Sequence, residues 1–277
     1  MRQAVLFIHG VGKQQAGYSS GLEKHIRKTI DKLLPETDPD IIYKEVLWAP
    51  ILQRHQNELW QRVKKGDGKN DLDMVKLRKF MLGFAGDAIA YQNDEVGKPI
   101  YNAIHQTITN ELESIQNELG DEAFELTIVA HSLGTVIASN YLYDHRASFK
   151  AVNFFTLGSP IAIWLLRYGS IANIDSAVEV ARPNGVWINI LDDEDIIGYP
   201  LRPLNSAYKA AVDMDYITEI GGLLSAGNPS SHVGYWEDGN VYKPIAKKLA
   251  MDHDRIVNHT TYSWPAYKKY IKKIWNF

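Results

Sequence analysis

Residues 124–142 (FELTIVAHSLGTVIASNYL) place one serine, Ser132, between two apolar stretches of different periodicity. The stretch before the serine is partly β-branched, which is typical of a buried parallel strand, and the stretch after it has helical spacing. A serine at a sharp strand-to-helix turn presents its hydroxyl at the positive end of a helix dipole, where it can act as a nucleophile. The turn requires small residues two positions before and after the serine, and Ala130 and Gly134 satisfy this. The alternative is a serine that only caps a helix.

A serine hydroxyl is a poor nucleophile until a base takes its proton, and the usual base is a histidine held by a carboxylate. His232 is the best candidate among nine histidines, because it lies in a loop after the last predicted strand and before the last predicted helix. His253 and His259 are later alternatives, within or beyond that helix. The acidic loop 192–195 offers carboxylates, and a solvated loop is its alternative interpretation. A calcium site there would need a fuller loop pattern.

Four segments together resemble the α/β-hydrolase family of lipases and esterases: VLFIHGVG, AHSLG, WINILDDED and SSHVGYW. In this family the serine, the acid and the histidine follow one another in that order along the chain. The resemblance implies that Ser132 is the nucleophile, Asp195 the acid and His232 the base, with Asp192 as the second choice for the acid. Two features depart from the family pattern. Ala130 replaces the commoner glycine, and the strands that precede the His-Gly strand in the family are missing, so we expect a reduced sheet.

The same resemblance implies an oxyanion hole made of backbone N–H donors. One donor is Leu133, directly after the serine, and the other is Val11, in the His-Gly turn after the first strand. His9 would position this turn and would not act as a base. Because only the N–H of Leu133 is needed, we expect its side chain to be replaceable. A nucleotide-binding turn is the alternative for the His-Gly-x-Gly segment, but neither the G-x-G-x-x-G nor the Walker A pattern is complete.

The elements around these residues alternate between strand and helix, which predicts an α/β-hydrolase architecture with a mostly parallel central sheet of about six strands, flanked by helices. The expected strands cover residues 4–8, 41–48, 126–130, 151–157, 185–191 and 214–220. Flanking helices are expected at 19–34 and 241–251, and a short helix is expected to end at 168.

A long segment without strand signals separates the second and third strands. It contains expected helices at 51–63, 72–91 and 98–119, and a turn or mobile loop at 66–71. This is longer than usual crossovers, so we interpret residues 50–120 as a helical insertion in a single domain of residues 1–277. The insertion either caps the site or packs on the flank of the sheet.

The composition of the 277-residue chain is that of an ordinary globular protein, with 45% hydrophobic and 23% charged residues. A net charge of −3 disfavours a nucleic-acid partner, and the absence of cysteine excludes disulfides and a thiol nucleophile. The apolar run near the N-terminus is too short for a signal peptide, and no stretch approaches a transmembrane segment. We therefore expect a cytoplasmic location; the oligomeric state stays open.

Together these patterns predict a serine hydrolase that cleaves a carboxylic ester through an acyl-enzyme intermediate. The expected substrate is a small-molecule or lipid acyl ester, and we predict no cofactor and no metal. The alternatives are a hydrolase of amides or thioesters, and a non-catalytic binding protein with the same fold.

Overall fold

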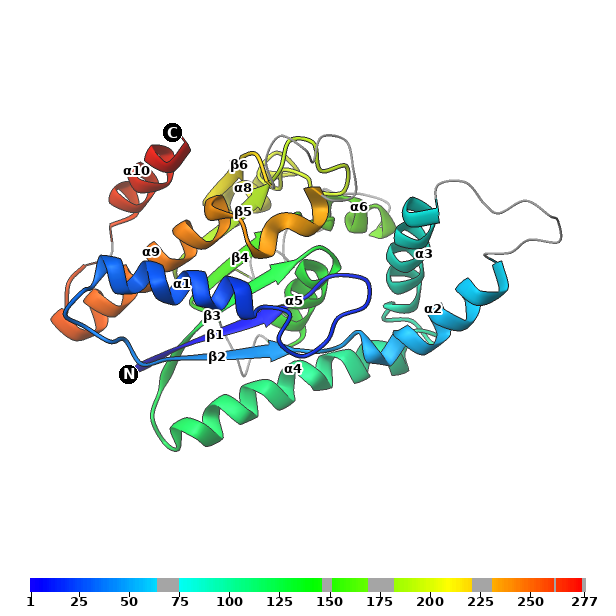
Figure 1. The fold of residues 1–277 in the computed structure, drawn as a ribbon, viewed down its shortest axis with the longest axis horizontal. Helices are drawn as coiled ribbons and strands as arrows, with labels where there is room; N and C mark the ends of the chain where they lie inside the picture. The colour runs from blue at the N-terminus through cyan, green and yellow to red at the C-terminus, as the bar shows by residue number, and fades with distance from the viewer. Residues whose placement is uncertain (64–74, 146–150, 169–181, 221–230, 262, 276–277) are drawn as a thin grey trace.

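The computed structural model describes residues 1–63, 75–145, 151–168, 182–220, 231–261 and 263–275 (Figure 1). At 54–56, 75–81, 231–233 and 274–275 only the backbone is described. The turn predicted at 66–71 lies outside the described residues.

A six-stranded sheet forms the centre of the structure, with strand order β2-β1-β3-β4-β5-β6 and parallel pairing throughout. The strands are β1 (Arg2–Ile8), β2 (Ile41–Val46), β3 (Phe124–His131), β4 (Asn153–Leu157), β5 (Trp187–Leu191) and β6 (Met214–Ile217). This confirms the predicted parallel α/β class, and it is consistent with an α/β-hydrolase-like fold. The carboxyl ends of β1, β3 and β4 lie side by side, since Ile8 pairs with Ala130 and His131 pairs with Leu157.

Helices cover both faces of the sheet (Figure 1). The core on one face includes residues of α2 (Pro50–Val63), α4 (Lys98–Leu119), α5 (Leu133–Asp144) and α8 (Ser206–Ala211). The core on the other face includes residues of α1 (Ser20–Leu33), α9 (Gly239–Asn258) and α10 (Trp264–Trp275). The sequence patterns missed α8 and α10, and they ended α9 too early. No helix in the described part of the chain is long and apolar enough to cross a membrane.

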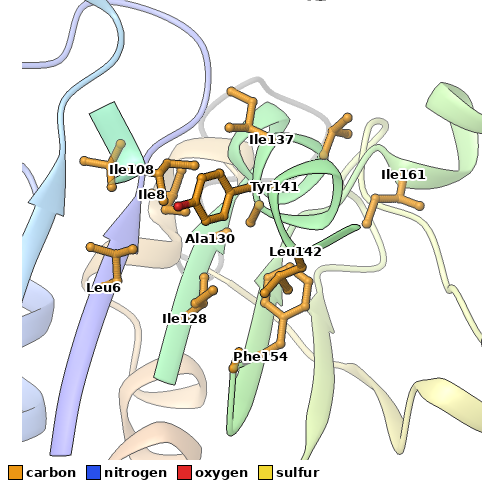
Figure 2. Packing of buried hydrophobic residues seen from close by; sticks show 14 of the residues in the cluster. Leu6, Ile8, Ile108, Ile128, Ala130, Ile137, Tyr141, Leu142, Phe154 and Ile161 are labelled. Atoms are coloured by element: carbon orange, nitrogen blue, oxygen red, sulfur yellow. The ribbon is translucent and has the colours of Figure 1, made fainter. Parts of the chain in front are cut away.

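Side chains along each strand alternate between these two cores. In β1, Leu6 and Ile8 belong to the core beneath α4 and α5, part of which Figure 2 shows, whereas Val5 and Phe7 face α1 and α9. All four side chains are buried, as expected for a parallel sheet covered on both faces. The strand ends that carry the candidate site therefore project from a closely packed base.

The helical insertion divides into two parts with different surroundings. In α4, Ile104, Ile108 and Ile115 are buried in the core, so this helix packs on the flank of the sheet. In contrast, α3 (Val75–Ala90) contacts α2 and α5 and stands beyond the carboxyl ends of the strands (Figure 1). The alternative that the insertion packs on the flank of the sheet is therefore correct for α4. Helix α3 instead lies at the end of the sheet where the candidate site is expected.

A buried ion pair within α9 is linked to the amino end of β4 by a hydrogen bond. The side chains of Lys248 and Asp252 are 1% and 2% exposed, and Lys248 Nζ lies 2.5 and 2.6 Å from the two oxygens of Asp252. The amide of Asn153, the first residue of β4, donates to the same carboxylate at 2.9 Å. Burial lowers the pKa of Lys248, and the adjacent carboxylate opposes this shift. The lysine thus depends on its partner to remain charged in the core.

We predict that Lys248→Met destabilises the protein by about 3–5 kcal/mol, because it leaves the Asp252 carboxylate buried without its main partner. The double variant Lys248→Met/Asp252→Leu should be less destabilised than the single variant. Urea unfolding at neutral pH measures the free energy of unfolding of both variants. A single variant as stable as the wild type would show that the pair does not hold α9 in place.

Candidate active site

The backbone at Ser132 is strained, as a sharp strand-to-helix turn requires. Its φ and ψ are 52° and −131°, and Ser132 and His259 are the only non-glycine residues with positive φ in the described part of the chain. An ordinary helix-capping serine has an extended backbone and accepts a hydrogen bond from its own helix. Ser132 has neither property, since its side chain makes no capping bond to α5. The structure thus argues against the helix-cap alternative, and strain of this kind is concentrated at functional sites.

Hydrogen bonds fix both sides of the strained residue. The N–H of Ser132 donates to the carbonyl of Leu157 at the end of β4, at 2.9 Å. The carbonyl of Ser132 accepts from the N–H of Thr135 at 2.9 Å and from its hydroxyl at 2.7 Å. Ser132 is therefore held between the sheet and the first turn of α5, and its residue exposure is 0%.

Two glycines allow the turn and the loop after β1 to touch. A Cβ at Gly134 would lie 2.4 Å from the carbonyl oxygen of His9 and 2.7 Å from that of Ile8. A Cβ at Gly10 would lie 2.4 Å from the Cβ of Ser132. The predicted need for a small residue at position 134 is thereby confirmed, and its cause is the close approach of the loop that follows β1.

His9 holds this loop in place as a neutral side chain. Its Nε2 accepts from the N–H groups of Trp48 at 3.2 Å and Ala49 at 3.3 Å, so Nδ1 carries the proton and donates to the carbonyl of Gly10 at 2.7 Å. The imidazole stacks on the indole of Trp48 with ring centroids 4.7 Å apart. Burial lowers the pKa of His9 to about 4, and the bond to Gly10 only partly offsets this. These contacts fit a positioning residue.

The two residues expected to form the oxyanion hole adjoin Ser132 in the chain (Leu133) or lie in the loop that approaches it (Val11). Leu133 is the first residue of α5, so its N–H is one of those that have no acceptor within the helix. Val11 follows Gly10 in the loop that contacts Ser132. Leu133 is also 1% exposed and belongs to the larger core, so replacing its side chain costs stability, while the expectation that catalysis needs only its N–H stays a prediction. Truncation of such a leucine costs about 2–5 kcal/mol.

Asp192 is a structural residue of the acidic loop after β5. Its Oδ1 accepts from the N–H of Glu194 at 2.7 Å, and its Oδ2 accepts from the N–H of Ile220 at 2.5 Å. Both carboxylate oxygens thus stabilise backbone turns. Among the described residues, no group of three or more His, Cys, Asp or Glu side chains is arranged to hold a metal ion.

Asp195, in the same loop, has a different environment. Its Oδ1 accepts from the N–H of Ile197 at 3.0 Å, and its Oδ2 accepts from the hydroxyl of Tyr235 at 2.9 Å. A Cβ at Gly158, the residue after β4, would lie 2.7 Å from Oδ2. Since the preceding residue, Leu157, holds the N–H of Ser132, the carboxylate lies at the strand end next to the candidate nucleophile.

The backbone of His232 lies in the turn η3 (Ser231–Trp236), and its side chain is outside the described part of the structure. The side chains of Tyr235 and Trp236 in the same turn are described. Tyr235 donates to Asp195, and its ring lies 5.5 Å from that of His131; the ring of Trp236 lies 5.8 Å from the same histidine. The turn that carries His232 therefore contacts both the candidate acid and the residue before Ser132.

Tyr235 itself was not predicted from the sequence. Burial and the nearby Asp195 carboxylate raise the pKa of Tyr235, so its hydroxyl stays protonated and donates. The same hydroxyl accepts from the N–H of Asp192 at 2.9 Å. An aromatic residue three positions after a histidine carries no signal for such a role, because Asp195 is 40 residues away in the chain.

The alternative histidines lie at the opposite end of the sheet. His253 follows Asp252, which contacts the first residue of β4, and His259 ends α9. Ser132 follows the last residue of β3. Neither histidine can reach the serine from there.

Among solved structures, the chain is similar to phospholipase PlaB from Legionella pneumophila in complex with thio-NAD, at 12% identity and a TM-score of 0.37. That match covers 98% of this chain and 61% of the phospholipase chain. A second structure of the phospholipase matches at 12% identity and a TM-score of 0.29, over 69% of this chain and 39% of the other. This chain thus spans less than two thirds of the phospholipase. No protein-family model and no curated protein matches it. Likeness at this level says nothing about activity.

We predict that Gly134→Ala destabilises the protein by about 1–3 kcal/mol or more, because the added methyl group overlaps the backbone after β1. Gly21→Ala in α1 is the matched control, since its Cβ would meet only Glu237 at an ordinary 3.6 Å. The free energy of unfolding of the control variant should be unchanged or higher by up to about 1 kcal/mol. Thermal unfolding compares them, and equal stability of the two variants would contradict the close approach.

The buried neutral state of His9 predicts a loss of stability in acid. Its pKa is about 4 in the folded protein and about 6.5 in an unfolded chain. The unfolded state therefore binds the proton first, and stability present above pH 6.5 is lost as the pH falls towards 4, by up to about 1.4 kcal/mol per pH unit. Urea unfolding at several values between pH 7 and 4.5 gives the free energy of unfolding as a function of pH. This free energy should fall less steeply with falling pH in His9→Gln than in the wild type. Equal slopes would contradict a neutral His9.

Proposed function

We propose that the protein is a serine hydrolase that cleaves carboxylic esters through an acyl-enzyme intermediate, with Ser132 as the nucleophile. The observation that carries this proposal is the backbone of Ser132. A non-glycine residue at φ 52° costs about 1–3 kcal/mol. A plain helix cap would not require this strain, whereas a nucleophile presented at a sharp turn does.

In this mechanism His232 takes the proton of the Ser132 hydroxyl as the oxygen attacks the ester carbonyl, and then gives it to the leaving alcohol. Asp195 orients the imidazole and stabilises its positive charge. The choice of Asp195 over Asp192 rests on their surroundings, because both oxygens of Asp192 serve backbone N–H groups. The hydrogen bond from Tyr235 to Asp195 joins the acidic loop to the turn η3, which contains the backbone of His232, and this link supports the pairing.

The negative charge that develops on the carbonyl oxygen needs donors that are already in position. The N–H of Leu133, at the N-terminus of α5, and the N–H of Val11 would supply them. The contact between Gly10 and Ser132 brings the Val11 loop to the serine, and the His9 network holds that loop. A water molecule, activated by His232, then releases the acid from Ser132 in the second half of the reaction.

Hydrolysis of p-nitrophenyl butyrate tests this proposal. Ser132→Ala and His232→Ala should each lower kcat by about 10³-fold or more, because triad residues act as a unit. Asp195→Asn should lower kcat strongly while the fold is kept. The exposed neighbour Asp193 provides the matched control, since Asp193→Asn leaves the carboxylate network intact.

Two results would contradict the proposal. Unchanged hydrolysis by Ser132→Ala would show that another group is the nucleophile. A folded wild-type protein that cleaves no ester, amide or thioester would favour a non-catalytic binding protein with the same fold. If Asp192→Asn lowered kcat as much as Asp195→Asn without lowering stability, the acid would be assigned to Asp192.

A further inference from the structure

An apolar groove with a volume of about 290 Å³ lies between α3 and the segment after β4. That segment contains α6 (Ile161–Trp164) and the turn η1 (Leu165–Tyr168). The lining includes Phe84, Ala85 and Ala88 from α3, and Leu133, Ile163 and Trp164 from the other side.

The groove includes the residue that follows the candidate nucleophile, while Ser132 itself is fully buried. Leu133 lines it and directly follows Ser132 in the chain. Pro160, which also lines it, comes two residues after Gly158, next to the Asp195 carboxylate. A group bound to Ser132 therefore has an apolar surface beside it, on the side where α5 begins.

Large apolar side chains surround the groove and remain in contact with water. Ile89 of α3 is 73% exposed, and Leu166 of η1 is 71% exposed. Ile163, on α6, is also exposed. Exposed apolar side chains gathered around a concave surface are typical of sites that bind an apolar ligand, because binding removes them from water.

The polar residues of the lining fit the same kind of ligand. They are Gln92 and Arg167, and the Arg167 guanidinium lies over the Trp164 ring, 4.9 Å from its centre. No carboxylate lines the groove among the residues that the structure describes. A fatty acid anion, the product of ester hydrolysis, would therefore meet no charge of its own sign.

The outer wall of the groove is anchored at its C-terminal end. Tyr91, directly after α3, is fully buried, and its hydroxyl lies 2.7 Å from Nε2 of His105 on α4. Its ring stacks on Tyr101 at 4.8 Å and lies 5.8 Å from Trp164 on the other wall. These contacts hold both walls in position, so the groove is formed before a ligand binds.

We infer that this groove binds the acyl chain of the ester substrate and that α3 limits the chain length. The inference rests on the proposed function for the reaction. Its volume of about 290 Å³ is just below the range for ligand pockets, about 300–1,000 Å³, which suits one acyl chain of medium length. The helical insertion then has a function: α4 covers the sheet, and α3 completes the acyl site.

Ala85→Trp, which fills the groove from the surface of α3, tests the inference with p-nitrophenyl acetate and octanoate below their micelle concentrations. The ratio of kcat/KM for octanoate over acetate should fall at least tenfold. Ala103→Trp, at an exposed alanine of α4, is the matched control and should keep the wild-type ratio. Phe84→Ala, which enlarges the groove, should move the preference towards longer chains, a gain that misfolding cannot produce.

Calorimetric titration of octanoate into Ser132→Ala and into Ser132→Ala/Ala85→Trp separates this inference from the proposed function. If octanoate binds to Ser132→Ala but not to the double variant, the groove assignment is supported. This holds even if the wild type cleaves no ester, and then only the hydrolase proposal fails. If the wild type cleaves esters but Ala85→Trp changes neither the chain-length ratio nor octanoate binding, the groove assignment is overturned and the hydrolase proposal stands.

Discussion

The strained backbone of Ser132 is the constraint on which the candidate site depends. A residue with a side chain stays at φ 52° and ψ −131° only if its surroundings hold it there. Here Leu157 fixes its N–H, Thr135 fixes its carbonyl, and the loop after β1 passes its Cβ so closely that a side chain at Gly10 would clash. The strain is maintained by the packed sheet, and the result is a serine at the point where β3 turns into α5.

The other parts of the site follow from this arrangement. Because the loop after β1 must pass next to the serine, its shape needs independent support, and His9 provides this by linking Gly10 to Trp48 and Ala49. On the other side, Tyr235 connects the acidic loop to the turn η3 through one buried hydroxyl. The carboxyl ends of neighbouring strands thus bring together segments that are far apart in the chain.

Much of this could be predicted from the sequence, because it depends on local pattern. Apolar runs indicated the six strands, and the small residues at positions 130 and 134 indicated the turn. Properties that depend on long-range contacts could not be predicted. In α9 the buried Asp252 follows the predicted helix end, and its partner Asn153 lies 99 residues away, so the apolar periodicity alone ended this helix too early. The burial of the Leu133 side chain likewise depends on long-range packing, because the core that contains it is assembled from several strands and helices.

The most direct test of the central claim is to locate the covalent adduct that a fluorophosphonate forms with the wild-type protein, by mass spectrometry of its peptides. The account predicts one modified residue, Ser132, and no modification of Ser132→Ala. Modification of another serine, or none in a folded protein, would contradict the claim that the strained serine between β3 and α5 is a nucleophile.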